Sequence, residues 1–402
     1  MVVDLSEADR RLVHELAAGV LRQRSTLDAQ LAPLVPRGWT SVAADLQDIL
    51  RLGAYQLTAL ERVPAHAAVD TSVSLAKASG GSRAAGFVNA VLRRLTRSEA
   101  RAAAGGARDA AALAREYSHP IWLVQRWLEQ FGSEGTEGLL RWNNTRPRLV
   151  IQPARENLAA LRVRLRASGV EVEPAPHDAG LMVSASRPAD LPGYSDGQFL
   201  VQNPAQALLG RFADLPAGST VYDTCAAPGG KTIALGRSAR VLVAGDINPA
   251  RAGRLQENLA RAGSGREHVI VADGRHPPVR PVNAVVLDVP CLGTGTFARH
   301  PDARWRVTPE ALNGLMRLQA KLLDRSAAVV APGGLLVYST CSLEPEENRL
   351  QVERFLQEHP EFHREATGAV SPDLLSSDGD LMVLPQRHGV DGAYAARLRR
   401  SP

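Results

Sequence analysis

The sequence predicts a multidomain protein with an all-helical N-terminal part, a small α+β insert and a C-terminal α/β domain. In the first part, apolar residues recur at the spacing of amphipathic helices. In the last part, short runs of β-branched and aliphatic residues alternate with helical segments, which is the pattern of a parallel, doubly wound sheet. The stretch between them mixes short strands with one helix. We therefore expect three parts that span residues 1–126, 127–198 and 199–402.

The composition is typical of a globular protein from a reducing compartment. Apolar residues make up 45% of the 402 residues and charged residues 22%, which suits domains with sizeable cores. The three cysteines are too few for a disulfide scaffold and too widely spaced for a metal site. No segment has the features of a secretion signal or a membrane span. We expect a cytoplasmic protein without a metal or membrane partner, and a monomer, although the sequence does not determine the oligomeric state.

The positive charge favours a polyanionic partner, but only weakly. The formal net charge is +5, and such a balance is also common in proteins that bind no nucleic acid. Nearly all of the positive charge is arginine, whose planar fork suits phosphates. Lysine occurs only at Lys77, Lys231 and Lys321. Because Lys231 directly follows two glycines, we expect this position to require lysine specifically.

Helical periodicity defines the elements of the N-terminal part. The predicted helices are Ala8–Arg22, Ser41–Leu60, Ala67–Ala78 and Ala84–Leu95. The Ala-, Gly- and Arg-rich segment Ser98–Ala114 is predicted to be a surface linker. A further helix is expected to begin at His119-Pro120 and to continue through Trp127.

The predicted insert and C-terminal part contain the strands. The insert has the strand Arg148–Gln152, the helix Leu158–Ser168, and the strands Val170–Val172 and Leu181–Val183. The C-terminal strands are Thr220–Tyr222, Val241–Ala244, Val269–Val271, Ala284–Leu287 and Leu335–Ser339. The helices between and after them include Pro249–Ala262, Pro309–Val330 and Pro345–Glu358. Ligands bind at the carboxyl ends of the strands in such sheets, so the residues there are candidates for chemistry.

The first C-terminal strand leads into a glycine-rich turn, Cys225-Ala226-Ala227-Pro228-Gly229-Gly230-Lys231. Paired glycines let the backbone approach a ligand and offer N–H groups to it. The next two strands end at Asp246 and near Asp273, where a carboxylate can accept hydrogen bonds from a ribose or contact an adenine. An ordinary tight turn with surface acids is the alternative. The combination favours a nucleoside cofactor, and the absence of a phosphate-binding fingerprint favours S-adenosylmethionine.

Two cysteines follow the last two predicted strands. Cys291 ends Asp288-Val289-Pro290-Cys291, and Cys341 follows Thr340. Each alone could be a small buried hydrophobe, but all three cysteines at strand ends favour a thiol enzyme. Addition of a thiolate to C6 of cytosine makes C5 nucleophilic enough to accept a methyl group, provided that an acid near N3 and a base for the C5 proton are present. Asp288 supplies a carboxyl group, but the residues alone do not say which thiol attacks and which assists release.

These motifs resemble those of the Sun/Fmu family of bacterial RNA (cytosine-5)-methyltransferases, known as the ribosomal RNA small subunit methyltransferase B family. The motifs that carry the resemblance are Asp223–Thr232, Asp288–Cys291, Thr294-Gly295, Arg299–Asp302, Tyr338–Ser342 and Pro345–Asn348. The resemblance implies a Rossmann-like, class I S-adenosylmethionine-dependent methyltransferase domain that modifies cytosine 967 of 16S ribosomal RNA. The N-terminal part is similar to the helical RNA-binding fold of the NusB antitermination factor, through Leu52–Leu57, Pro64–Val69 and Phe87–Arg93.

The resemblance also implies a role for each candidate residue. Cys225–Lys231, Asp246, Asp273 and Asp288 are expected to contact the cofactor or to lie beside it. Cys341 is implied as the nucleophile and Cys291 as the residue that helps to break the covalent adduct, with Asp288 in the catalytic group. The third cysteine, Cys225, then belongs to the cofactor turn.

Three positions depart from the pattern of the family. Val289 and Leu292 stand where the family usually has alanine and serine, which affects the shape of the pocket. Asn203 stands where an aspartate is usual, which affects RNA contacts or helix capping. The same chemistry on tRNA or on another ribosomal position is an alternative, as is a non-catalytic assembly factor, against which the intact Asp288, Cys291 and Cys341 argue. The exact target base, and whether the RNA is free or assembled into a subunit, are not determined by the sequence.

Overall fold

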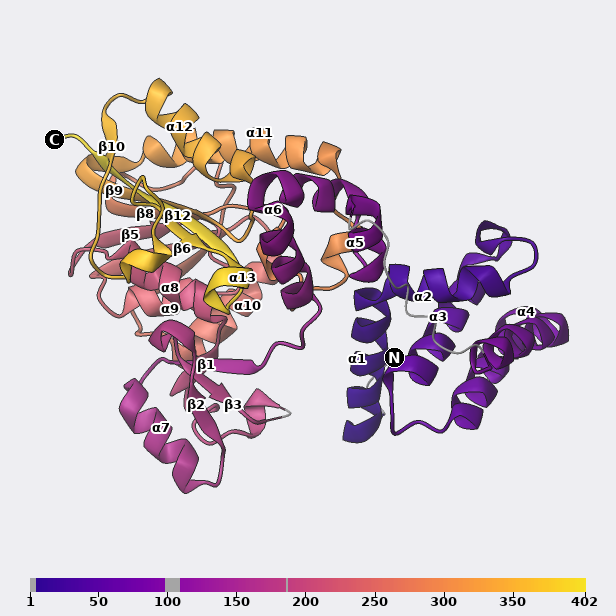
Figure 1. Ribbon diagram of the computed structural model, residues 1–402. Helices are drawn as coiled ribbons and strands as arrows, with labels where there is room; N and C mark the ends of the chain where they lie inside the picture. The colour runs from indigo at the N-terminus through magenta and orange to yellow at the C-terminus, as the bar shows by residue number, and fades with distance from the viewer. Residues whose placement is uncertain (1–4, 98–108, 186) are drawn as a thin grey trace. The chain divides into compact units, whose positions relative to one another are not determined.

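The computed structural model describes residues 5–97, 109–185 and 187–402 (Figure 1). The chain divides into two compact units. The first combines Met1–Thr145 with Phe297–Arg306, and the second combines Arg146–Thr296 with Val307–Pro402. The predicted boundaries at 126 and 198 stay predictions. Among the described residues, no helix has the length and apolar character needed to cross a membrane.

The first unit is helical, as predicted. Its helices are α1 (Glu7–Arg22), α2 (Arg24–Leu31), α3 (Ala44–Ala59), α4 (Ala65–Leu95), α5 (Ala110–Glu116) and α6 (Ile121–Asn143). The two helices predicted within 67–95 are joined in α4 around a non-helical break at Gly80 and Gly81, where Gly81 has φ +70°. The α2 helix was not predicted, because its short sequence offers only Leu27 and Leu31 to the core.

The prediction that Ser98–Ala114 is a linker is wrong for its C-terminal end. Its residues 98–108 lie outside the described part of the chain. Ala110–Ala114 belong to α5, whose first turn is capped by the Asp109 side chain accepting a hydrogen bond from the backbone N–H of Ala112. Alanine is the strongest helix former, so the alanine-rich end of this segment favours a helix over a linker.

A segment that is distant in sequence from the other helical residues completes the helical unit. Phe297–Arg306 belongs to this unit although it lies between strands and helices of the second one in sequence. Arg304 is fully buried, and its guanidinium donates hydrogen bonds to the backbone oxygens of Asn143 (2.7 Å) and Ser118 (3.2 Å). Burial lowers the pKa of Arg304 to about 9. The carbonyl oxygens that follow α5 and α6 carry the negative ends of the helix dipoles, which offset this cost.

The second unit begins with the predicted insert. Its antiparallel sheet has the order β2-β3-β1-β4, formed by β1 (Leu149–Pro153), β2 (Val172–Pro174), β3 (Leu181–Val183) and β4 (Phe199–Val201). The helix α7 (Leu158–Ala167) packs on this sheet through Leu161 and Leu165. The strand predicted at Val170–Val172 lies two residues further along, because Val170 closes the turn after α7 with a hydrogen bond to Leu165.

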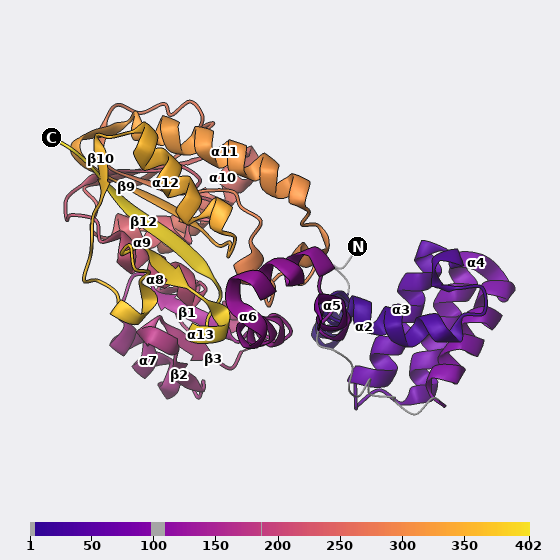
Figure 2. The same cartoon turned by 45° about the horizontal axis from the view of Figure 1, so that its top comes forward.

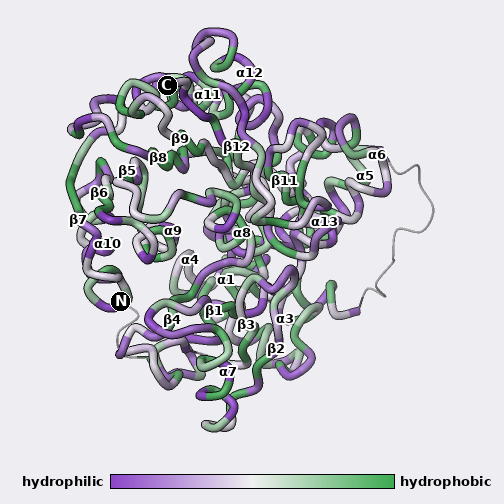
Figure 3. Tube along the Cα trace, turned by 90° about the vertical axis from the view of Figure 1, so that its left-hand side faces the viewer, coloured by the Kyte–Doolittle hydropathy of each residue, from purple (hydrophilic) through white to green (hydrophobic). Residues whose placement is uncertain are grey.

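The C-terminal sheet contains the five predicted parallel strands in the order β7-β6-β5-β8-β9. They are β5 (Thr220–Asp223), β6 (Val241–Asp246), β7 (Glu267–Val271), β8 (Val282–Asp288) and β9 (Val330–Thr340). Figure 3 shows the hydrophobic character of β8 in the middle of this sheet. Three further strands, which were not predicted, extend it beyond β9: β10 (Phe362–Arg364), β11 (Leu381–Val383) and β12 (Ala393–Arg400). The arginines of β12 interrupt its apolar pattern, and buried Arg397 pairs with Glu365.

Helices cover both faces of this sheet (Figure 1). One face carries α8 (Pro204–Ala213), α9 (Gly230–Gly236) and α10 (Pro249–Ala262), and the other carries α11 (Pro309–Ala327) and α12 (Arg349–Glu358). Figure 2 shows α11 and α12 side by side. Alternate residues of β8 enter the two cores, with Ala284 and Val286 in one and Val285 and Leu287 in the other. Burial on both faces explains the nearly continuous apolar runs from which these strands were predicted.

Two helix predictions need correction at their ends. The helix predicted at Pro309–Val330 ends at Ala327, because Val330 begins β9. The helix predicted at Pro345–Glu358 is broken at Asn348, which separates a short 3-10 turn, Pro345–Glu347, from α12. Asn348 has φ −115° and ψ −109° and turns its side chain toward the strand ends described below.

Candidate active site

The carboxyl ends of neighbouring parallel strands bring the candidate residues together within the second unit. Because β5 lies between β6 and β8, Asp223 at its end is flanked by Asp246 and Asp288. Because β8 pairs with β9, Asp288 lies in register with Ser339, two residues before Cys341. The prediction that the two cysteine-bearing strands are neighbours is therefore confirmed.

The glycine-rich turn after β5 requires glycine at Gly229 and is closely packed at Gly230. Gly229 has φ +105°, in the left-handed region that favours glycine. A Cβ atom on Gly230 would lie 2.9 Å from the amide nitrogen of Gln202. The turn is tied to β6 by a 2.9 Å hydrogen bond from the N–H of Ala226 to the carbonyl oxygen of Gly245. The turn leads directly from the carboxyl end of β5 into α9.

The two aspartates that are proposed to contact the nucleoside, Asp246 and Asp273, differ in their hydrogen-bond partners within the protein. Oδ1 of Asp246 accepts hydrogen bonds from the backbone N–H of Asn248 (2.8 Å) and from Nε of Arg251 (3.1 Å). No partner of Oδ2 is found among the described residues, so this oxygen is left to accept a ribose hydroxyl. Asp273 engages Arg275 through both carboxylate oxygens, and this ion pair lowers the pKa of Asp273. Arg275 would have to turn aside before Asp273 could bind a ligand through its side chain.

Asp223 is an unpredicted member of the site. It is fully buried, and its Oδ2 accepts a 2.7 Å hydrogen bond from Thr232 in α9. Its Oδ1 is buried and has no hydrogen-bond partner among the described residues. Burial raises the pKa of Asp223 to about 6, against which Thr232 and Lys231 act. An unsatisfied acceptor below a glycine turn fits a ligand with a cationic amino group, such as the amino acid end of S-adenosylmethionine.

Lys231 joins the cofactor turn to the catalytic residues. Its ammonium lies 2.6 Å from Oδ2 of Asp288 and also donates to Gln206. Oδ1 of Asp288 accepts a 2.9 Å hydrogen bond from Ser339. Burial lowers the pKa of Lys231, but Asp288 and Asp223 outweigh burial and raise it overall. Lys231 is therefore a cation held beside Asp288 at the strand ends, a contact that a lysine at this position supplies.

The two candidate catalytic thiols are in contact. Sγ of Cys291 lies 3.4 Å from Sγ of Cys341. The hydrogen bond to Cys341 and burial raise the pKa of Cys291 well above its ordinary value, so its sulfur keeps its proton at neutral pH. The pKa of Cys225 is raised by burial to about 12, and this side chain packs against the core beneath the sheet. Cys225 is thus an inert member of the cofactor turn, whereas the other two cysteines form a thiol pair.

Glu347 supports the loop that carries Cys291. Its buried carboxylate accepts a 3.0 Å hydrogen bond from the backbone N–H of Leu292 and a 2.8 Å bond from the Gln319 amide. The same amide of Gln319 donates to the carbonyl oxygen of Pro290 at 2.9 Å. The residues on both sides of Cys291 are therefore fixed to one buried polar pair. Burial raises the pKa of Glu347.

Asn348 supports the loop that carries Cys341 in the same way. Its Oδ1 accepts a 2.6 Å hydrogen bond from Thr340, and its Nδ2 donates a 2.9 Å bond to the carbonyl oxygen of Ser342. The carbonyl oxygen of Cys341 itself accepts a 3.0 Å bond from the N–H of Gly295. A Cβ atom on Gly295 would lie 2.8 Å from that oxygen, so this close approach requires glycine.

The three departures from the family pattern have local explanations. Val289 packs in the core on the α11 side of the sheet, and Leu292 is buried. Asn203 accepts a 2.8 Å hydrogen bond from the N–H of Ala205 as the N-cap of α8, and its amide donates to Asp391. An aspartate in place of Asn203 would face the Asp391 carboxylate without a donor between them.

Sequence reasoning missed the residues that support the site rather than react in it. These residues are Asp223, Gln319, Ser339, Glu347 and Asn348. All of these residues except Gln319 occur in the motifs that carried the resemblance, but nothing in their spacing says which groups they contact. Among the described residues, no group of three or more potential ligands is arranged to hold a metal ion.

Comparison with known proteins identifies each part of the chain. Residues 213–399 match the family model described as 16S rRNA methyltransferase RsmB/F, residues 3–97 match the NusB family, and residues 119–190 match a ferredoxin-like domain of RsmF/B-like methyltransferases. A probable ribosomal RNA small subunit methyltransferase B from Synechocystis is 35% identical, with 99% of this chain and 92% of that protein covered. The ribosomal RNA small subunit methyltransferase B of Pseudomonas putida is 34% identical over 98% of this chain and 91% of its own length.

The solved structures agree on the fold. The crystal structure of PH0851 superposes with a TM-score of 0.82 over 97% of this chain and 90% of that chain, at 24% sequence identity. The predicted combination of a NusB-like helical domain, an α+β insert and a Rossmann-like methyltransferase domain is confirmed. The chain belongs to the RsmB/F family of S-adenosylmethionine-dependent ribosomal RNA methyltransferases.

Proposed function

We propose that this enzyme methylates C5 of one cytosine in 16S ribosomal RNA through a covalent bond between Cys341 and C6 of the base. The observation that carries the proposal is the pair of thiols, 3.4 Å apart, beside the Lys231–Asp288 ion pair. A non-catalytic RNA-binding protein would have no need to keep two thiols, a partly buried carboxylate and a partly buried lysine at one edge of a sheet.

The proposed reaction begins with the thiolate of Cys341. Its sulfur forms a bond to C6 of the cytosine, and the electron pair of the C5–C6 double bond becomes available at C5. Asp288, held by Lys231, is placed beside N3, and the proton that N3 takes up as charge develops comes from the Lys231–Asp288 pair. C5 then accepts the methyl group that S-adenosylmethionine supplies, a base removes the C5 proton, and the electron pair left at C5 restores the double bond as the sulfur leaves C6.

The surroundings of the two thiols differ in a way that supports unequal roles. The raised pKa of Cys291 keeps a proton on its sulfur, which suits a residue that donates to Cys341 when the adduct breaks. The family resemblance assigns the nucleophile to the cysteine of the Thr340-Cys341 motif. We therefore assign attack to Cys341 and release to Cys291.

For the cofactor, we propose that the turn Cys225–Lys231 holds the amino acid end of S-adenosylmethionine together with Asp223. Oδ2 of Asp246 suits the ribose hydroxyls, and Asp273 lies further along the same edge, near the expected adenine. The cytosine must leave any stack to enter such a site, since its C5 and C6 are reached only when the base is everted.

The substrate is tested by sequencing bisulfite-treated RNA from cells with and without this protein. We expect one 16S cytosine to lose its protection from conversion when the protein is absent. Loss of protection at a tRNA cytosine or at a different ribosomal cytosine would show that the target is a different base. No change at any cytosine would contradict C5 methylation.

The roles of the thiols are tested with the purified protein and RNA that carries the target. Cys341→Ala is expected to abolish 5-methylcytosine formation, whereas Cys291→Ala is expected to accumulate a protein–RNA adduct that survives denaturing gels. Retained activity in the first variant, or normal turnover without an adduct in the second, would show that the roles are misassigned.

A further inference from the structure

The two thiols of the candidate active site are close enough to form a disulfide. Sγ of Cys291 lies 3.4 Å from Sγ of Cys341. An S–S bond is about 2.0 Å long, so the sulfurs have to approach by only about 1.4 Å, a distance that small rotations of the two side chains cover. Neither cysteine is fully buried, so a small oxidant can reach the pair.

The backbone holds the two cysteine-bearing loops together. Asp288 and Ser339 are in register on the neighbouring strands β8 and β9, and the cysteines come three residues after Asp288 and two after Ser339. Paired Cα atoms of neighbouring strands are about 4.8 Å apart, within the range of about 4.4–6.8 Å that a disulfide spans. Beyond the strands, the N–H of Gly295 donates a 3.0 Å hydrogen bond to the carbonyl oxygen of Cys341. The loops are thus already in contact, and a disulfide between them requires no rearrangement of the sheet.

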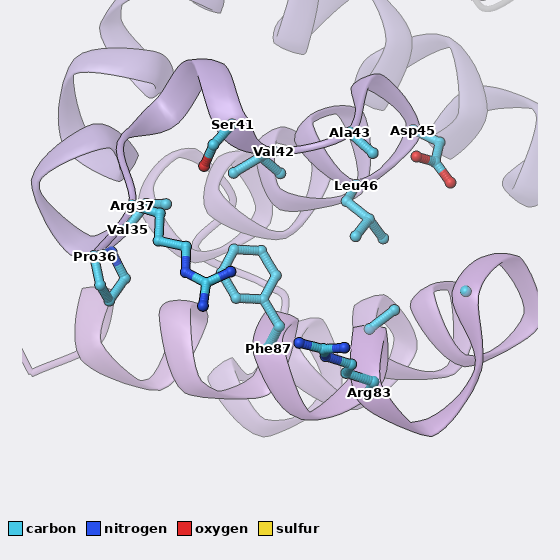
Figure 4. Close-up of a pocket in the computed structure, with 12 residues that line it drawn as sticks. Val35, Pro36, Arg37, Ser41, Val42, Ala43, Asp45, Leu46, Arg83 and Phe87 are labelled. Carbon is cyan, nitrogen blue, oxygen red and sulfur yellow. The ribbon is translucent and has the colours of Figure 1, made fainter.

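The rest of the chain offers no second pair of this kind. Within the described residues, Cys225 packs against the core and has no sulfur within hydrogen-bond distance. The helical unit contains no cysteine in its sequence. It has a cavity of about 610 Å³ between the segment that leads into α3 and the second half of α4, and the described residues that line this cavity are neither cysteine nor methionine (Figure 4). Cys291 and Cys341 are therefore the cysteines that are arranged to form a disulfide.

We propose that hydrogen peroxide oxidises Cys291 and Cys341 to a reversible disulfide, and that this disulfide switches the methyltransferase off. One thiol takes an oxygen atom from the peroxide and becomes a sulfenic acid, while the O–O bond breaks and the other oxygen leaves as water. The second thiol attacks the sulfenic sulfur, so that the S–S bond forms, the S–O bond breaks and a second water leaves. The two sulfurs give up two electrons in total, and these reduce one peroxide to two waters.

The effect on activity rests on the proposed function, because the disulfide removes the thiol that adds to C6 of the base. Reduction restores it by thiol–disulfide exchange: the thiolate of one glutathione bonds to one sulfur and frees the other thiol, and a second glutathione frees the remaining thiol as glutathione disulfide leaves. The disulfide also protects the site. A sulfenic acid without a neighbouring thiol is oxidised further to sulfinic and sulfonic acids, which glutathione does not reduce.

The experiment treats the full chain, reduced and then freed of reductant, with increasing concentrations of hydrogen peroxide. Mass mapping of peptides after alkylation of the unfolded protein identifies the cysteines that remain thiols. Transfer of a radiolabelled methyl group from S-adenosylmethionine to target RNA, added after the oxidation, measures activity. We expect the peptides of Cys291 and Cys341 to be joined while Cys225 stays reduced. Activity should fall at least about tenfold as the disulfide forms and should return after treatment with dithiothreitol.

Two variants test the role of the partner thiol. In Cys291→Ala, Cys341 has no thiol beside it, so peroxide should add two oxygen atoms to its sulfur, and dithiothreitol should not remove them. Cys225→Ala is the matched control, because it also removes one thiol but leaves the pair intact, and it should form the disulfide at the wild-type rate. Both variants are compared by mass, which does not depend on their activity. Thermal unfolding before oxidation verifies that each variant is folded.

The proposal is overturned if both thiols of the wild type survive peroxide, if Cys341 is oxidised without bonding to Cys291, or if the disulfide form is fully active. Failure of the proposed function is recognised separately, from the methylated product. If the reduced enzyme methylates RNA elsewhere than at C5 of cytosine and the disulfide still stops methyl transfer, the switch stands and the assigned chemistry is wrong. If 5-methylcytosine forms but no disulfide does, the chemistry stands and the switch is refuted.

Discussion

Replacing Asn348 with aspartate tests whether this residue positions Cys341. The side chain of Asn348 accepts from Thr340 and donates to the carbonyl oxygen of Ser342, so it fixes both neighbours of Cys341. The introduced carboxylate can still accept from Thr340, but its other oxygen faces the Ser342 carbonyl and no hydrogen lies between them. Losing one buried hydrogen bond and leaving the acceptor unsatisfied costs about 2–4 kcal/mol of folding free energy.

The same change should slow attack on the base. A displacement of about 1 Å at a reacting group can reduce a rate about 100-fold. The assay is the rate of covalent complex formation with RNA that carries 5-fluorocytosine at the target, because fluorine at C5 prevents elimination and the adduct accumulates. We expect Asn348→Asp to slow this rate at least tenfold.

The pH dependence of the adduct-formation rate distinguishes a loss of Cys341 positioning from a general loss of folded structure. A protonated carboxyl can donate to Ser342 as the amide does, so the repulsion from the carbonyl raises the pKa of the introduced group above its unfolded value of about 3.9. A raised folded pKa stabilises the protein at low pH, and this stability is lost as the pH rises through the folded pKa. The rate of the variant relative to the wild type should therefore rise as the pH falls.

Gln357→Glu is the matched control, because it adds one negative charge at an exposed position of the same helix. The reasoning is refuted if Asn348→Asp forms the adduct at the wild-type rate, or if the control slows it as much.

Three further predictions concern other buried polar groups. Glu347→Gln keeps one side-chain oxygen for Leu292 and Gln319 but replaces the other, which also accepts from Leu292, with an amide donor, so it should cost about 0.5–1.5 kcal/mol and slow release, seen as more denaturation-resistant adduct with ordinary RNA; faster turnover would contradict this. Asp223→Asn removes a carboxyl whose pKa of about 6 exceeds the ordinary 3.8, so the folded protein loses stability as the pH rises from 3.8 to about 6. The variant should gain about 3 kcal/mol at pH 7 and nothing below pH 4 in thermal unfolding without cofactor, and equal gains at both pH values would refute burial as the cause. Asn203→Asp should cost about 2–3 kcal/mol at pH 7 and less at pH 4, where the carboxyls protonate, and a pH-independent melting temperature would exclude repulsion from Asp391.

The sequence predicted best those strands whose side chains are buried on both faces of the sheet. Strands such as β8 are covered on both faces, so their apolar runs were visible directly. The antiparallel strand β12 was missed because Arg397 and Arg399 interrupt its apolar pattern. Buried Arg397 is satisfied by its ion pair with Glu365 and by hydrogen bonds to the carbonyl oxygens of Ala213 and Asp214. The Phe297–Arg306 segment was expected within the catalytic domain, and only the tertiary structure assigns it to the helical unit.

The candidate site was predictable where it follows from strand ends. The carboxyl ends of parallel strands share one edge, so Asp246, Asp288 and Cys341 were expected to converge. The residues that hold the two cysteine-bearing loops in place were not predictable, because a side chain such as Gln319 contacts Pro290 although the two are distant in sequence. No local pattern records such a contact.

The sequence by itself determined the class of this protein: a helical domain, a small insert, and a methyltransferase sheet with a glycine turn, three acids and two thiols at strand ends. Only the tertiary structure shows that the two thiols are in contact and that the pKa of Cys291 is raised. The causes of this shift, burial and the contact with the Cys341 thiol, arise only after folding. Burial and charge act over distances in space, whereas sequence patterns report only spacing along the chain.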